Sequence, residues 1–144
     1  MKITIKEPSA GAEEEIIVLC HDISPELLRV LNSLKTPNNM LVANIDNEIH
    51  RVNPLDIFYI ESVDRKTFLY CENDVYESKQ KLYELEELAM KNFLRISKSV
   101  LVNVNKIKTF IPSLSGNGEV VLLNREKLAI SRRYVNELRE TLGM

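Results

Sequence analysis

Short apolar runs interrupted by turn-forming residues make up most of this chain. From residue 40 onward each run is only a few residues long, and breaks such as Asp46-Asn47, Glu72-Asn73-Asp74 and Ser115-Gly116-Asn117-Gly118 separate them. Runs of this length, bounded by Asn, Asp, Gly and Ser, are typical of β-strands joined by tight turns. The sequence therefore predicts a mainly β domain with a few short helices over residues 40–144.

The expected elements of this domain follow from the spacing of apolar residues. Strands are predicted at residues 41–45, 48–52, 57–60, 67–71, 75–77, 93–96, 100–104, 108–111, 119–123 and 128–130. Helices are predicted at residues 79–90 and 131–142, the second capped by Ser131 and ended by Gly143. We expect the strands to form small sheets that pack face to face.

Residues 1–39 have a different pattern and are predicted to form a separate small α+β unit. Residues 2–6 alternate polar and apolar side chains, and residues 16–20 are a short apolar run, so each favours a strand. Ser24-Pro25 favours the start of a helix with leucines along one face, and residues 36–39 favour a linker. Such a unit buries little surface alone, so we expect it to pack against the rest of the chain or a second subunit.

The net charge of −2 conceals an uneven distribution along the 144 residues. Residues 91–144 hold ten Lys or Arg against four Asp or Glu, a net charge of +6, and residues 1–90 hold nine against seventeen, a net charge of −8. A polyanion responds to the local field, which is screened over roughly 8 Å at physiological salt. The basic last third is compatible with phosphate contacts, and equally with a chance split of solvated charges.

The sequence lacks the usual motifs of enzymes and of metal or cofactor sites. No glycine-rich phosphate loop is present, and His21 and His50 have no partner at zinc-ligand spacing. Cys20 and Cys71 are far apart, which favours reduced structural thiols. No signal peptide or membrane-spanning run is evident, so we expect a soluble, cytoplasmic protein that has no catalytic site, cofactor, metal or small-molecule substrate.

Three stretches of the sequence have a recognisable pattern: residues 56–62 (DIFYIES), residues 93–103 (FLRISKSVLVN) and residues 130–134 (ISRRY). Together, in this order and at these distances, they resemble the LytTR family of bacterial DNA-binding domains. The resemblance covers residues 41–144. The N-terminal unit and the total length also resemble the stand-alone members of the family, which lack a receiver domain.

The resemblance implies an elongated stack of small β-sheets that inserts loops into successive major grooves of double-stranded DNA. Three segments of this chain match those loops, and their candidate contact residues are Arg65, Lys66 and Thr67; Arg95, Ser97, Lys98 and Ser99; and Ser131, Arg132 and Arg133. Arg can donate two parallel hydrogen bonds to guanine, whereas Lys, Ser and Thr suit phosphate oxygens. Where many family members have His-Arg or His-Asn, this chain has Ser97-Lys98, which favours phosphate contact there.

Other roles for these residues remain open from the sequence. Ser131 could only cap its helix, Arg95 could form an ion pair on a sheet face, and Asn103 fits a structural turn residue better than a DNA contact. The leading hypothesis is a sequence-specific transcription regulator that binds DNA as a homodimer. The alternative is a protein-interaction module with weak or lost DNA binding, held by the small membrane protein with which stand-alone family members are often paired.

Overall fold

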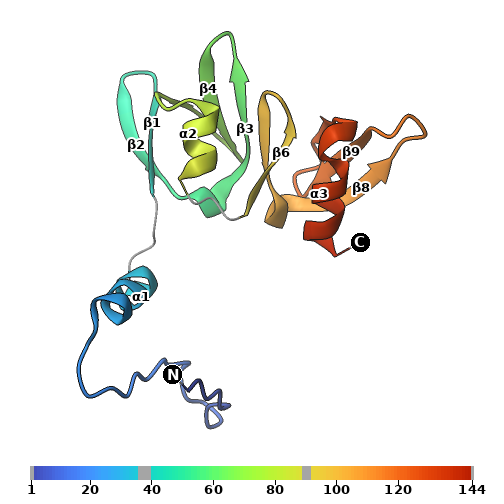
Figure 1. Cartoon of the computed structure of the whole chain (residues 1–144). Coiled ribbons are helices and arrows are strands. Elements are labelled where there is room, and N and C mark those ends of the chain that lie inside the picture. Colours follow the sequence, from blue (N-terminus) through green and yellow to red (C-terminus); the bar gives the residue numbers. More distant parts are fainter. Residues whose placement is uncertain (1, 36–39, 89–91, 144) are drawn as a thin grey trace. The chain divides into compact units, whose positions relative to one another are not determined.

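A computed structural model of the protein describes residues 2–35, 40–88 and 92–143. The chain divides into two units, residues 1–36 and residues 37–144 (Figure 1). In the described part of the chain, no helix is both long enough and apolar enough to cross a bilayer.

The first unit contains one helix, α1 (Pro25–Lys35), at the predicted place. The hydroxyl oxygen Oγ of Ser24 accepts a hydrogen bond from the Leu27 amide at 3.1 Å, as an N-cap residue does. The two predicted strands are wrong: residues 2–6 and 16–20 have no regular structure, and Ile5 and Leu19 are 91% and 92% exposed. Alternation is a local signal, but a strand forms only when another strand pairs with it. The predicted linker at 36–39 lies outside the described residues.

The second unit is mainly β, as predicted, and contains two antiparallel sheets. The larger has seven strands in the order β2-β1-β5-β4-β3-β7-β6, and the smaller has three in the order β10-β9-β8. The seven strands are β1 (Leu41–Ile45), β2 (Glu48–Val52), β3 (Ile57–Val63), β4 (Lys66–Cys71), β5 (Val75–Ser78), β6 (Phe93–Ser97) and β7 (Val100–Asn103). The three are β8 (Ile107–Pro112), β9 (Gly118–Leu122) and β10 (Lys127–Ile130). Single 3-10 turns, Pro54–Asp56 and Val104–Lys106, precede β3 and β8.

The two helices of this unit differ in how well the sequence predicted them. α3 (Arg132–Leu142) ends as expected at Gly143, whose φ of 77° is the left-handed conformation that glycine favours. α2 (Leu82–Glu87) is shorter than the predicted helix at 79–90, of which residues 89 and 90 lie outside the described part. It begins late because the Gln80 amide donates to the Ser78 hydroxyl at 3.1 Å, which forms a turn first.

Two hydrophobic clusters hold the unit together. One joins strands of the larger sheet to α2 and includes Ile60, Leu69 and Leu85, all fully buried. The other joins the two sheets to α3: Val102 comes from the larger sheet, Leu122 from the smaller sheet and Leu138 from the helix. Burying each such side chain contributes about 1.5–3 kcal/mol to folding. The second cluster therefore fixes the smaller sheet and α3 against the larger sheet.

Candidate nucleic-acid interface

The first two predicted contact segments are tight turns that lie at the same edge of the larger sheet. β3 and β7 pair in antiparallel register with Glu61 opposite Val100, so the end of β3 lies beside the start of β7. The Ser62 amide, near the end of β3, donates to the Ser99 carbonyl at 2.8 Å and joins that strand end to the second turn. In Figure 1 the turn between β3 and β4 and the turn that follows β6 both point toward the top of the view.

The third segment, at the start of α3, is linked to the second. The Ser131 amide donates to the Ile96 carbonyl at 2.8 Å, which places the first residues of α3 beside the end of β6. We call the edge formed by the β3–β4 turn, the β6–β7 turn and the start of α3 the rim. Two main-chain hydrogen bonds, one on each side of the β6–β7 turn, therefore join all three segments.

The rim carries exposed positive side chains from each of its segments. Lys66 begins β4, Lys98 occupies the β6–β7 turn and Arg132 begins α3. Within the described part of the chain none of these three forms an ion pair. Arg65 and Arg133 are also exposed, and Asp64 is the acidic residue of the first turn. Side chains of this kind suit a polyanion.

Two predicted contact residues do not point outward. Thr67 is only 4% exposed. Neighbouring side chains on β4 point to opposite faces of the sheet, and because Lys66 points to the exposed face, Thr67 points to the buried one. Arg95 forms an ion pair with Glu86 of α2, with Nε 2.7 Å from the carboxylate, and its guanidinium also donates to the Lys98 carbonyl. The ion-pair alternative for Arg95 is therefore confirmed.

The predicted serines are partly used within the rim. The Ser97 hydroxyl accepts a hydrogen bond from the Ser99 amide at 3.3 Å, and both side chains are half-buried. Ser131 is exposed and is the N-cap residue of α3, as predicted, but its side chain makes no capping hydrogen bond. The Arg132 amide donates instead to the Asn117 side-chain oxygen at 2.8 Å. The Arg132 amide is therefore not free to bind a phosphate.

The sequence also missed residues that the fold brings to the rim. Thr67 lies opposite Ser78 in the β4–β5 pair, so exposed Lys79 lies beside Lys66. Asn117 and its neighbours reach Arg132 from the turn between β8 and β9. The pairing register could have revealed Lys79, but no local sequence signal connects Asn117 to a helix that starts 15 residues later.

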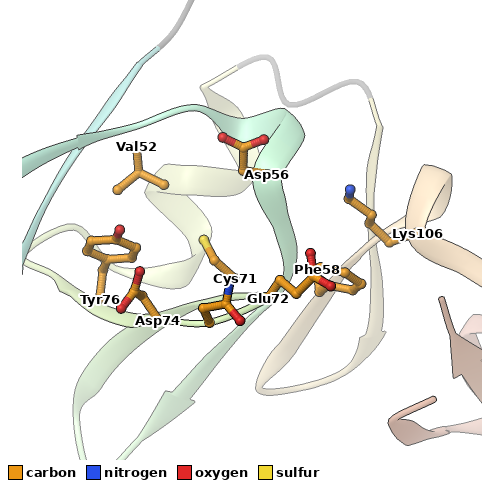
Figure 2. A pocket seen from close by; sticks show the side chains of 9 residues that line it. Val52, Asp56, Phe58, Cys71, Glu72, Asp74, Tyr76 and Lys106 are labelled. Carbon is orange, nitrogen blue, oxygen red and sulfur yellow. The ribbon is translucent and has the colours of Figure 1, made fainter. Parts of the chain in front are cut away.

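A pocket of about 250 Å³ lies at the opposite end of β4 from the rim (Figure 2). Asp56, Cys71, Asp74 and Lys106 are among the residues that line it. The pKa of the Cys71 thiol is raised to about 11, chiefly by burial and also by Asp56 and Asp74, whereas Lys106 opposes the rise. The thiol is therefore protonated at neutral pH and is a poor nucleophile. The described residues contain no group of three or more His, Cys, Asp or Glu that could hold a metal ion.

Known proteins resemble this chain along most of its length. A relative from Staphylococcus aureus strain MSSA476, described as an uncharacterised HTH-type transcriptional regulator, is 29% identical over 100% of this chain and 99% of its own length. One of the same description from strain N315 is 29% identical over 86% of this chain and 84% of its own length.

A solved structure also matches the fold: the LytTr DNA-binding domain of a protein described as a methyl-accepting/DNA response regulator from Bacillus cereus. Its TM-score is 0.69 at 27% identity, over 74% of this chain and 99% of that domain. In the described part of this chain strands separate the helices, so no two helices form a helix-turn-helix. The sequence model of the protein family described as the LytTr DNA-binding domain matches residues 47–143 of this chain. The ISRRY segment at the rim thus lies within that match, and the chain belongs to the LytTR family of DNA-binding domains.

Proposed function

We propose that this protein is a sequence-specific DNA-binding transcription regulator and that the rim is its DNA-binding surface. The observation that carries the proposal is the placement of Lys66, Lys98 and Arg132 on three segments that main-chain hydrogen bonds hold together. Family membership and the regulator relatives support the same function. In this proposal the protein acts as a binding module in the cytoplasm, without a catalytic step.

The rim residues make different contacts with DNA because their side chains differ in chemistry. Arg132 offers a planar guanidinium that can read the O6 and N7 atoms of guanine in a major groove. Lys66 and Lys98 carry point charges on flexible stems and contact phosphates, with Arg65 and Arg133 beside them. The two turns and the start of α3 enter the major grooves, in place of a recognition helix that lies along a groove. Arg95 stabilises the Lys98 turn through its hydrogen bond to the Lys98 carbonyl and does not itself contact DNA.

We further propose that two copies bind together, because one small module contacts too few base pairs to be selective in a genome. The first unit provides the contact between copies: Ile5, Ile17 and Leu19 are among its exposed large apolar residues.

Replacing both Ile17 and Leu19 with Asp in the full chain should produce a monomer in sedimentation velocity. Ala12→Asp, at an exposed position of the same unit, is the control. An unchanged sedimentation coefficient would contradict this assignment.

Selection of bound sequences from random DNA, followed by mobility-shift titration, tests the DNA-binding proposal. We expect enrichment of a repeated motif, and a loss of affinity of about 1–3 kcal/mol, or 5- to 150-fold, for Arg132→Ala on that motif. Folded protein that enriches no motif, or an Arg132→Ala variant with unchanged affinity, overturns it.

A second candidate is an interaction module that a small membrane protein restrains. The exposed apolar residues of the first unit and the Ser97-Lys98 departure from the family motif favour it. This reading predicts that the folded full chain enriches no DNA motif and sediments with membranes of the source cells. The Ile17→Asp and Leu19→Asp changes should then release it from the membranes.

A further inference from the structure

The turn between β8 and β9 holds Arg132 at two points. The side-chain oxygen of Asn117 accepts the Arg132 amide at 2.8 Å. The Arg132 stem lies so close to Gly116 that an added Cβ there would be 2.6 Å from Cδ and 3.1 Å from Cγ of the arginine. The main chain of Arg132 and the aliphatic part of its side chain thus both rest on this turn.

The turn has a defined shape of its own. The Ser113 amide donates to the Asn117 carbonyl at 2.9 Å, and the Gly116 amide donates to the Ser113 carbonyl at 3.1 Å. Gly116 has a φ of +91°, which other residues rarely adopt. An added Cβ at Gly118 would be 2.7 Å from the Ile111 carbonyl oxygen, so the turn is also packed closely on β8. A turn built in this way can serve as a fixed support.

We propose that Gly116 and Asn117 are positioning residues that set the direction of the Arg132 side chain, and through it the affinity and base preference of the rim. The inference rests on the proposed DNA-binding function. Arg132 is exposed and begins a helix, so without support its long side chain would sample many rotamers. A side chain held before DNA arrives loses less entropy on binding, and its donors point in one direction.

The source of the cap distinguishes this arrangement from an ordinary helix start. A helix is usually capped by the residue that precedes it, but the Ser131 hydroxyl makes no such bond here. The cap comes from the smaller sheet, 15 residues earlier in the chain. Any displacement of that turn therefore moves Arg132.

Asn117→Ala tests the proposal first without DNA. Loss of the acceptor should raise the hydrogen-exchange rate of the Arg132 amide about tenfold, as expected for one lost hydrogen bond. Asn117→Asp keeps a side-chain oxygen at this place and should restore the protection. Unchanged exchange in Asn117→Ala overturns the positioning role, whether or not the protein binds DNA. Failure of wild-type protein to enrich a motif would instead overturn the proposed function.

A double-mutant cycle then connects the turn to binding. Asn117→Ala alone should lower affinity for the selected motif several-fold, about as much as one hydrogen bond is worth. In an Arg132→Ala background it should cause no further loss, because its effect passes through Arg132. An equal loss in both backgrounds would mean that Asn117 acts independently of Arg132, which contradicts the proposal.

Gly116→Ala provides a second test with a matched control. Gly143 also has a positive φ, of +77°, but an added Cβ there meets nothing within 4 Å. Both alanine variants carry backbone strain, and only Gly116→Ala also displaces the Arg132 stem. We expect Gly116→Ala to reduce DNA affinity several-fold more than Gly143→Ala does and to alter the selected motif. Equal affinities for the two variants would overturn the role of Gly116.

Discussion

Asn103 at the end of β7 donates its side-chain amide to the main-chain carbonyl of Ile57 at 2.9 Å. Its side-chain oxygen accepts the Asn105 amide at 3.0 Å and so starts the 3-10 turn that follows. The residue is only 1% exposed. Asn103 belongs to the motif by which the sequence resembles its family, and the structure confirms the expectation that its role is structural.

Removal of the Asn103 side chain should therefore destabilise the fold. Asn103→Ala leaves the buried Ile57 carbonyl without its donor, and we expect a loss of about 1–3 kcal/mol in the free energy of unfolding. Asn103→Asp should cost more, because it puts a charge in a buried position. Urea unfolding measures both. Asn105→Ala, at an exposed position, is the control, and a similar midpoint for Asn103→Ala and Asn105→Ala would refute the assignment.

Arg95 and Arg132 should respond in opposite ways to replacement by Ala. Arg95→Ala breaks a partly exposed ion pair with Glu86, so stability should fall by less than about 1 kcal/mol while the selected DNA motif stays the same. Arg132→Ala should leave the unfolding midpoint nearly unchanged and relax the motif. Thermal unfolding and sequence selection on the same samples measure the contrast. A motif altered by Arg95→Ala would place that residue in the interface.

Lys66 and Lys98 should each contribute to the salt dependence of binding. If each neutralises one phosphate, Lys66→Ala and Lys98→Ala should each reduce the slope of log K against log salt by about one. Lys127→Ala is the control, because Lys127 is exposed at the end of β10 farther from the start of α3. Titrations at several salt concentrations measure the slopes. Slopes equal to that of the wild type would remove these lysines from the phosphate contacts.

The two cysteines should differ in reactivity. Cys20 is exposed, whereas Cys71 is half-buried and its thiol pKa is raised from its ordinary value of 9.0 to about 11. At pH 8, iodoacetamide should therefore label Cys20 quickly and Cys71 slowly in the folded chain, and both quickly in urea. Mass spectrometry of the digested protein reads both sites. Equal labelling of the folded chain at the two sites would contradict this account.

The same thiol predicts a decrease in stability at high pH. The folded chain holds the Cys71 proton more tightly than the unfolded chain does. The contribution of the protonated thiol to the free energy of unfolding is therefore complete below pH 9 and is lost as the pH rises toward about 11. Urea unfolding at several pH values should show a smaller decrease over this interval for Cys71→Ser than for wild type. Identical decreases in the two proteins would show that Cys71 does not cause it.

Local features of the fold were predictable from the sequence because their causes are local. The β1–β2 hairpin forms at Asp46-Asn47, where Asp46 adopts a φ of 52°, as tight turns favour. All four side chains of residues 57–60 are buried, as the continuous apolar character of this run predicted. α3 also ends at the predicted glycine.

The remaining features depend on contacts between distant residues. The alternation at residues 2–6 could not reveal that no described strand pairs with it, and the position of Thr67 next to Lys66 could not reveal which of the two faces inward. The cap on Arg132 comes from Asn117, in the turn between β8 and β9. The three motifs identified the segments of the candidate interface, but only the strand register and the main-chain hydrogen bonds bring them to one edge.

The bonds from Ser62 to Ser99 and from Ser131 to Ile96 use main-chain atoms alone. Any residue other than proline can supply the amide, and every residue supplies the carbonyl. Mutation can therefore exchange the outward side chains of the three segments while their spacing is preserved. Under the proposed function, a scaffold of this kind would allow the target sequence to change one residue at a time without a new fold.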